Sequence, residues 1–355
     1  MNSISATGRR EFITSSAKLC AHLSLTPFFV SLPFSNAYGR PVDKNFEPAY
    51  LKLYQTGELK SRAQQLQAMM EACVLCPRQC GVNRLKGETG FCRSPGTALI
   101  VSSAHPHFGE ERPLVGHRGS GTIFFAHCGL RCVFCQNWEI SHLGRGNSRS
   151  HEELADMMLH LQQRGCHNIN LVSPSHYSAT IFHALDVAAG RGLRLPIVYN
   201  TCGWERLEIL HLLDGIVDIY LPDFKFWDND ISIKYSAGAG DYPDVTRAAL
   251  LEMHRQVGVA RPTVGGLIQR GLMIRHLVMP NNKGGSEEII NWIADNLTKD
   301  TYVNIMAQYS PHYKAYDFPE ISRRITSQEY RTVVKAAETA GLTNLDVQGY
   351  WWLKR

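Results

Sequence analysis

The chain has 355 residues, and its 44% hydrophobic content is enough to form one large globular domain of barrel size. The formal net charge at pH 7 is only +5, and Lys and Arg are spread along the chain rather than gathered in a block. This balance does not indicate a nucleic-acid groove, and no stretch reaches about 18 uninterrupted apolar residues, so no membrane span is expected.

Residues 1–37 are typical of a removable export signal. Arg9 and Arg10 form a twin-arginine motif before a largely uncharged, moderately apolar stretch, and Ser35-Asn36-Ala37 offers small residues for cleavage. A functional signal of this type sends a folded, cofactor-loaded protein to the periplasm. The alternatives are a chance Arg-Arg pair in an N-terminal extension and a wrongly chosen start codon.

A helical and cysteine-rich metal-binding module is expected over residues 48–110. Residues 50–70 have apolar side chains at helical spacing and lead into four cysteines. These cysteines are Cys73, Cys76, Cys80 and Cys92. Four thiols this close together suit a closed metal site, and zinc and an auxiliary iron–sulfur cluster fit it about equally. Disulfide bonding is a third alternative for an exported protein.

A cysteine triplet with the spacing Cys128-x3-Cys132-x2-Cys135 is the most specific feature of the chain. Three thiolates so close together can hold three irons of a cubane cluster, and no fourth cysteine follows nearby to close the site. One iron is then open to a cofactor. A zinc site completed by His127 or His142 is the alternative. The spacing resembles the signature of the radical S-adenosylmethionine (SAM) superfamily, in which the amino and carboxylate groups of SAM bind the open iron.

From residue 121 onward, an apolar strand-like run followed by an amphipathic helix recurs six times. The expected strands are 121–127, 168–173, 196–200, 216–222, 272–279 and 302–307. The expected helices are 151–164, 178–190, 204–213, 244–256, 286–297 and 327–340. This alternation predicts an α/β fold with a parallel sheet covered by helices. Six units rather than eight predict an open, partial (β/α)6 barrel of the TIM type within residues 115–350.

The chemistry of such barrels lies at the carboxyl ends of the strands, so the residues there are the candidates for the site. They are Phe134, Ser173, Asn200, Thr201, Asp223, Lys225 and His276. Taken alone, Asp223 and Lys225 have the alternative of a solvated charged pair, and His276 that of a hydrogen-bonded core residue. Cys166 and Cys202 are interpreted as buried, unreactive thiols, with the alternative for Cys202 that its place at a strand end lets a substrate reach it.

Residues 48–352 resemble the activating-enzyme-like radical SAM proteins, such as the pyruvate formate-lyase activating enzyme. The resemblance rests on the runs Cys-Val-Leu-Cys-Pro-Arg-Gln-Cys-Gly-Val-Asn-Arg84, Cys-Val-Phe-Cys-Gln-Asn137, Tyr-Leu-Pro-Asp-Phe-Lys225 and Ile-Arg-His-Leu-Val-Met-Pro280. It implies that Phe134 lies against the adenine and that Lys225 contacts the SAM carboxylate, with Asn200, Thr201 and Asp223 beside it. Many members carry Gly-Gly-Glu for the SAM amino group where this chain has Ser173, which leaves that contact to backbone carbonyls.

The resemblance also implies the cofactors and the activity. A [4Fe-4S] cluster, reduced by a donor such as flavodoxin or ferredoxin, cleaves SAM to a 5′-deoxyadenosyl radical that removes hydrogen from a substrate. A protein glycine or another polypeptide position is the first candidate substrate, and a small metabolite or a nucleic acid base is the second. A non-catalytic iron–sulfur or zinc module is the alternative from another class. SAM is supplied in the cytoplasm, which conflicts with the export predicted from residues 1–37.

Overall fold

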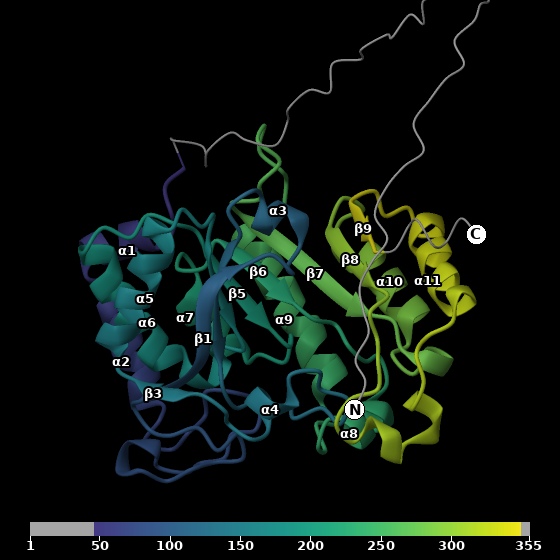
Figure 1. The fold of residues 1–355 in the computed structure, drawn as a ribbon, viewed down its shortest axis with the longest axis horizontal. Coiled ribbons are helices and arrows are strands. Elements are labelled where there is room, and N and C mark those ends of the chain that lie inside the picture. The colour runs from purple at the N-terminus through teal and green to yellow at the C-terminus, as the bar shows by residue number, and fades with distance from the viewer. Residues whose placement is uncertain (1–45, 349–355) are drawn as a thin grey trace, which may run out of the picture. The chain divides into compact units, whose positions relative to one another are not determined.

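A nine-stranded sheet organises residues 46–348, the part of the chain that the computed structural model describes (Figure 1). The strand order is β3-β1-β2-β4-β5-β6-β7-β8-β9. The strands are β1 (Leu99–His107), β2 (Ser120–Phe125), β3 (Asn147–Arg149), β4 (Ile169–Val172), β5 (Ile197–Thr201), β6 (Ile219–Pro222), β7 (Gly271–Leu277), β8 (Tyr302–Met306) and β9 (Leu345–Val347). Within the described residues β3 and β9 are the sheet's two edges, so the sheet does not close.

The parallel part of the sheet confirms the predicted partial barrel. The six expected strands correspond to β2, β4, β5, β6, β7 and β8, each within three residues of the expected ends, and neighbours among them pair in parallel. The sequence did not reveal β1, which pairs antiparallel with both β2 and β3. Because β1 includes Ser103, His105 and His107, no continuous apolar run marks it.

The helices cover the sheet, and six of them confirm the predicted positions within three residues. The helices are α1 (Tyr50–Thr56), α2 (Glu58–Ala68), α3 (Arg112–Val115), α4 (Trp138–Ser141), α5 (His151–Gln163), α6 (Ser178–Gly190), α7 (Leu207–Leu213), α8 (Asn229–Tyr235), α9 (Tyr242–Val257), α10 (Ser286–Asn296) and α11 (Ser327–Thr339). Short 3-10 helices are η1 (Arg84–Lys86), η2 (Ser175–Tyr177), η3 (Pro280–Asn282), η4 (Ala315–Asp317) and η5 (Pro319–Ile321). Ser150 and Thr326 form capping boxes that fix where α5 and α11 begin.

The segments 48–110 and 115–350 belong to one compact unit in the described part of the chain. α2 packs against α6, and β1 lies inside the main sheet. In Figure 1, α1, α2, α5 and α6 lie together on one side, while α10 and α11 lie near β8 and β9. The cysteine-rich segment and the barrel therefore pack together within one compact unit.

The interior of the barrel is sealed by apolar side chains at the end where the parallel strands begin. Leu114 of α3 packs there with side chains of four strands and of the loop before β7. The set consists of Leu114, Val198, Ile219, Leu221, Ala260, Ile268, Met273 and Tyr302. This plug leaves the opposite end, where the parallel strands finish, available for a site.

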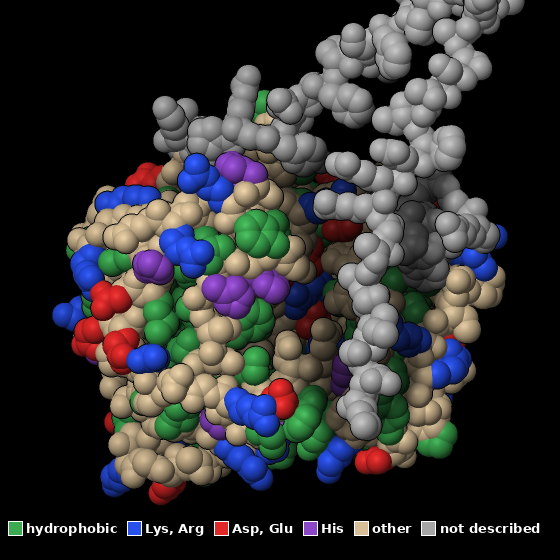
Figure 2. Space-filling model, viewed as in Figure 1, with side chains coloured by type: hydrophobic (Ala, Val, Ile, Leu, Met, Phe, Trp, Pro, Cys, Tyr) green, Lys and Arg blue, Asp and Glu red, His purple; other side chains and the backbone are tan. Residues whose placement is uncertain are grey.

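The surface agrees with the small net charge. On the face in Figure 2, basic and acidic side chains are interspersed, and neither sign forms a continuous patch. None of the helices within residues 46–348 has the length and hydropathy needed to cross a membrane. The export signal expected at residues 1–37 lies outside the described residues.

Candidate active site

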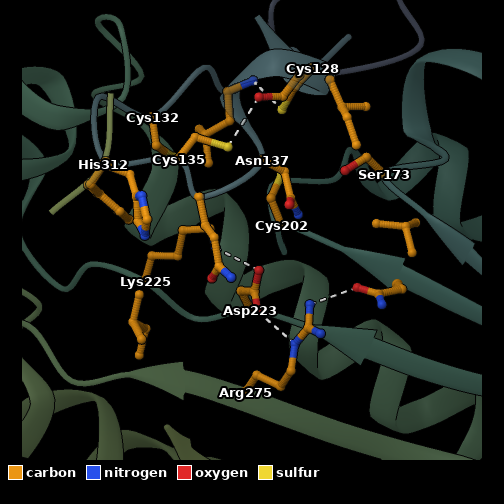
Figure 3. A pocket seen from close by; sticks show the side chains of 18 of the residues that line it. Cys128, Cys132, Cys135, Asn137, Ser173, Cys202, Asp223, Lys225, Arg275 and His312 are labelled. Carbon is orange, nitrogen blue, oxygen red and sulfur yellow. Dashed lines mark hydrogen bonds and ion pairs between the residues drawn. The ribbon is translucent and has the colours of Figure 1, made fainter. Parts of the chain in front are cut away.

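A cavity of about 250 Å³ lies at the carboxyl ends of the parallel strands, and all three cysteines of the triplet line it (Figure 3). Of the seven residues expected at strand ends, all except His276 also line the cavity. They are Phe134, Ser173, Asn200, Thr201, Asp223 and Lys225. Loops that are far apart in the sequence therefore meet at one cavity, where the cysteines form one wall and the charged residues form another. The barrel topology places the ends of the parallel strands together in this way.

The cysteine loop follows β2 directly and is shaped by unusual backbone angles. His127 and Arg131 have positive φ values of 71° and 52°. The left-handed region is costly for residues other than glycine, and such strain is typical of segments held for function. The loop is fixed from outside, because Val133 N donates to Tyr235 O and Val133 O accepts from Lys314 N, each at 2.9 Å.

Each sulfur of the triplet has a hydrogen-bonding neighbour supplied by the fold. Cys132 Sγ lies 3.2 Å from Ser236 Oγ, which follows α8, and Cys135 Sγ lies 3.1 Å from Ser141 Oγ at the end of α4. Cys128 Sγ accepts from the Leu130 N–H at 3.4 Å. Partners of this kind orient metal ligands and tune the bound metal.

The surroundings of these thiols fit a bound cation. Burial raises the pKa of Cys132 to about 12 and also raises the pKa of Cys135, so thiolates there need positive charge nearby. Neither His127 nor His142 lines the cavity, which leaves the zinc alternative without its expected fourth ligand. Within residues 46–348, no three His, Cys, Asp or Glu side chains are spaced for a single metal ion. Three thiols on one cavity wall suit a cluster, which spreads its ligands more widely.

A buried ion-pair network forms the opposite wall of the cavity (Figure 3). Lys225 Nζ donates to Asp223 Oδ2 at 2.6 Å, and Arg275 Nε donates to Asp223 Oδ1 at 2.8 Å. Arg275 Nη2 also donates to Asn200 Oδ1 at 2.7 Å. Burial opposes ionisation of Asp223, yet Arg275 and Lys225 hold the pKa of its carboxyl below the ordinary value. The sequence placed Asp223 and Lys225 here but did not single out Arg275.

Two further parts of the wall come from the ends of β4 and β5. Ser173 has a positive φ of 59°, and its N–H donates to Asn200 O at 2.8 Å, so the chain turns sharply at the cavity. Behind this turn, Ser175 and Thr201 both donate to one carboxylate oxygen of Glu205. Burial raises the pKa of Glu205 to about 7. No spacing rule links Glu205 with Ser175, so sequence reasoning could not have found this contact.

Aromatic rings form the apolar side of the cavity. Phe134 is buried, and its ring centroid lies 5.9 Å from the rings of both Phe226 and Tyr309. Phe134 and Tyr309 both line the cavity. The two rings offer a surface against which a flat heterocycle can pack.

The structure places His276 in the core rather than in the cavity, contrary to the expected contact with SAM. Its side chain is fully buried, Nδ1 lies 2.7 Å from Phe224 O, and Nε2 lies 2.8 Å from Ser286 Oγ. Burial lowers the pKa of His276 to about 4, so the ring is neutral at pH 7. The residue joins β7 to the loop after β6 and to the start of α10.

We therefore expect His276→Ala to act on stability. The replacement leaves a cavity and two buried polar atoms without partners, which together cost about 3 kcal/mol of unfolding free energy. Urea unfolding of the cluster-free protein measures this loss. His160→Ala, at an exposed position near the end of α5, is the control and should change the unfolding free energy by less than about 0.5 kcal/mol. If His276→Ala also lost less than about 0.5 kcal/mol, the structural role of His276 would be contradicted.

Cys202 is a cavity-lining thiol, as the alternative based on its place at a strand end predicted. It follows β5, is partly exposed and lines the same cavity as the triplet. Cys166, by contrast, is buried and does not line the cavity. The interpretation as an enclosed thiol therefore fits Cys166 but not Cys202.

The second cysteine group packs against the triplet loop through Arg78. Arg78 Nε donates to Gly129 O and Nη2 donates to Ser236 O, each at 3.0 Å. Its guanidinium lies 4.1 Å from the ring centroid of Phe91 and 4.9 Å from that of Trp204. One arginine thus bridges the residue after Cys128 and the serine beside Cys132. The disulfide alternative is not realised, because the nine cysteines of the described range are free.

Comparison with known proteins agrees with this geometry. A family model described as the radical SAM superfamily matches residues 122–293. The uncharacterized protein MJ0674 of Methanocaldococcus jannaschii is 33% identical over 313 residues, which cover 85% of this chain and 84% of the relative. A second uncharacterized protein of that organism, MJ0808, is 22% identical over 284 residues, which cover 72% of this chain and 78% of the relative. The chain belongs to the radical SAM superfamily, whose members are enzymes that use SAM and a [4Fe-4S] cluster.

Solved structures give more distant matches. A radical SAM methyltransferase from Sphaerobacter thermophilus aligns with a TM-score of 0.42 and 13% identity, over 84% of this chain and 91% of that one. Streptococcus suis SuiB bound to its precursor peptide SuiA aligns with a TM-score of 0.44 and 12% identity, over 62% of this chain. The match covers 46% of the SuiB chain, so this protein spans less than half of its length.

Proposed function

We propose that the protein abstracts a hydrogen atom from a polypeptide, with a glycine of a partner enzyme as the first candidate. The observation that carries the proposal is the cavity itself, where the cysteine triplet faces the buried network of Asp223, Lys225 and Arg275. When bound there, the cluster and SAM supply a 5′-deoxyadenosyl radical. A flavodoxin or ferredoxin is the proposed one-electron donor.

The chain's own residues bind the cofactor and exclude water. Lys225 offers its ammonium to the SAM carboxylate, and Asp223 holds Lys225 in place. Phe134 and Tyr309 would pack against the adenine, and Leu277 and Met306 are apolar side chains on another part of a lining that also includes polar ones. Apolar side chains keep water away from a reactive radical and so limit its side reactions.

The open sheet favours a polypeptide substrate over a small one. Within the described residues β3 and β9 are the two edges of a sheet that does not close, and we propose that a loop of another protein approaches the cavity between these edges. A small metabolite or a nucleic acid base remains the second candidate, since an open barrel also admits these. The same fold and cofactors serve many substrates.

Anaerobic reconstitution of the full chain with iron and sulfide, followed by reduction and addition of SAM, tests the proposal. We expect SAM to change the EPR signal of the reduced cluster and 5′-deoxyadenosine to form. A reducible cluster that does not respond to SAM would support the electron-transfer module instead. Mass spectrometry of candidate glycyl radical enzymes after the reaction then tests the polypeptide substrate.

We also propose that Cys73, Cys76, Cys80 and Cys92 hold an auxiliary metal group. Burial raises the pKa of Cys76 to about 12, and the other three thiols lie close enough to raise it further. Nearby positive charge favours thiolates in such a group. Metal analysis separates the alternatives, because a second [4Fe-4S] cluster adds about four irons per chain, whereas zinc adds one equivalent of zinc.

Replacing Ser141 should shift the reduction potential of the cluster without removing it. A hydroxyl near Cys135 Sγ that donates to the sulfur stabilises the reduced, more negative cluster. We expect Ser141→Ala to lower the midpoint potential by on the order of tens of millivolts, measured by EPR-monitored redox titration. Ser148→Ala, an exposed position in β3, should leave the potential unchanged. Equal potentials in all three proteins would show that the Ser141 contact does not act on the cluster.

A further inference from the structure

A group of polar side chains lies inside the barrel next to the cavity and is not used in the proposed cofactor binding. We name it the polar layer, and it consists of Glu110, Glu111, Asn170, Arg275 and Asn304. Glu110 Oε2 lies 3.6 Å from Arg275 Nη1, and Asn304 Nδ2 donates to Glu111 Oε1 at 2.9 Å. Arg275 and Asn304 occupy paired positions on β7 and β8. Of the polar layer, only Arg275 also lines the cavity, so the two meet at this residue.

Several atoms of the polar layer are buried without a hydrogen-bond partner. Asn170 is fully buried and lies beside Glu110, and apart from a weak contact with that carboxyl group neither of its side-chain amide atoms has a hydrogen-bond partner. Asn304 is 2% exposed and its Oδ1 has no partner, and Glu111 is 6% exposed and its Oε2 has no partner. Unpaired buried polar groups are costly and rare, so a cluster of them calls for a ligand.

The unpaired atoms are mostly acceptors. Three of them accept hydrogen bonds, namely the carbonyl oxygens of Asn170 and Asn304 and one carboxylate oxygen of Glu111. Only the Asn170 amide nitrogen donates. A complementary ligand group therefore carries several N–H donors, whereas a carboxylate or phosphate would meet acceptors that repel it.

The charges point to the same kind of group. The carboxyl groups of Glu110, Glu111 and Asp223 face two cations, Lys225 and Arg275, so negative charge is in excess when Glu110 is ionised. Burial raises the pKa of Glu110 to about 7, because the attraction of Arg275, which lowers this pKa, is weaker than the effect of burial. If Lys225 binds the SAM carboxylate, the remaining groups are still richer in negative charge. A cation rich in N–H donors satisfies both the charge and the hydrogen bonds.

We infer that the polar layer recognises a guanidinium or ammonium group of the molecule on which the enzyme acts. The inference rests on the proposed function, since it places this group beside the cavity that holds SAM. Glu110 keeps about a tenth of its side chain exposed, so the layer is not sealed from solvent. Glu111 and the two asparagines would form the inner end of the site, and Glu110 would form its entrance.

Calorimetric titration of the reconstituted full chain, without reductant, tests this inference. The probes are N-acetyl-arginine amide, N-acetyl-lysine amide and N-acetyl-citrulline amide, the last having nearly the shape of the arginine compound without its charge. We expect at least one cationic probe to bind at least about tenfold more tightly than the citrulline probe. We expect Glu111→Gln to remove this preference and the exposed Glu71→Gln to retain it. Equal binding of all three probes by the native protein would overturn the inference.

A stability measurement guards against a variant that fails to fold. Because Glu111 Oε2 has no partner, the neutral Glu111→Gln should melt at the same temperature as the native protein or higher, since binding sites store such unfavourable charge. A melting temperature many degrees lower would show that the carboxylate serves the fold, and would overturn the inference. Free agmatine and a Gly-Arg-Gly peptide then distinguish a small amine from a polypeptide side chain, and either result supports recognition of the cation.

The two proposals fail in different measurements. Cation binding is read without reductant and without turnover, so a negative result counts against the polar layer alone. Absence of 5′-deoxyadenosine from the reduced native enzyme with SAM counts against the proposed function alone.

Discussion

Cys132→Ala is expected to abolish both the cluster and the cleavage of SAM. Cys132 is buried between the loop after β2 and the end of α8, where no other side chain of the triplet can replace its sulfur. A cluster held by two protein thiols is lost or degraded, and without it no electron reaches SAM. We expect the iron content to fall by about four irons per chain, leaving only any iron of the second cysteine group, and 5′-deoxyadenosine formation to fall on the order of 10³-fold or more. Iron analysis, EPR and chromatography of the nucleoside products measure both effects, and Cys128→Ala and Cys135→Ala should behave alike.

Cys202→Ala is the matched control, because Cys202 is a thiol that lines the same cavity outside the triplet. This variant should keep its iron and its SAM-dependent EPR change, since three cysteines suffice for a cluster with one open iron. If the loss of Cys202 instead removed the cluster, or if SAM perturbed the cluster only in the variant, Cys202 would be a fourth ligand. That result would favour the electron-transfer module.

The sequence predicted the parallel part of the barrel because that part depends on local, periodic signals. Buried parallel strands such as β5 and β6 are continuous apolar runs, and the amphipathic helices between them have a clear period. The residues at their carboxyl ends could then be assigned to one site by topology alone, as for Asn200 and Asp223. His276 lies within β7 rather than after its end, and the prediction that it reaches the cavity was wrong.

The remaining parts of the site depend on contacts that no local pattern encodes. Arg275 reaches Asp223 only because β6 and β7 are neighbours in a particular register. Glu110 reaches the same arginine from the loop after β1, a strand that the sequence did not reveal. For Cys202 the sequence indicated its place at a strand end but left open whether its side chain is enclosed or faces the cavity, because the spacing of cysteines does not show which way a side chain points. Such features follow from packing, which a single sequence does not specify.

Removing the Asp223 carboxylate is expected to have the largest effect on stability. Its oxygens are bound by Lys225 at 2.6 Å and by Arg275 at 2.8 Å, and the side chains of all three residues are at most 16% exposed. Asp223→Ala leaves Lys225 without its carboxylate and Arg275 with only the longer ion-pair contact to Glu110 at 3.6 Å, which costs about 3 kcal/mol or more. Urea unfolding of the cluster-free protein measures this loss.

Asp214→Ala provides the contrast, because Asp214 pairs with Arg255 on the surface, where the side chains are 41% and 57% exposed. Its loss should cost less than about 1 kcal/mol, as is usual for solvated ion pairs. Equal losses in the two variants would contradict the view that burial gives the Asp223 network its importance.

The pH dependence of stability gives an independent check of the same network. Because the pKa of Asp223 is lowered in the folded protein, its contribution is present above the unfolded carboxyl range near pH 4 and is lost as the pH falls through the lower folded value. The native protein should therefore lose more stability on acidification than Asp223→Asn, which has no proton to take up at this position. Parallel pH profiles would show that the carboxylate is not held ionised by Lys225 and Arg275. A steeper native profile would establish that the cavity wall expected to bind SAM is built around one buried negative charge.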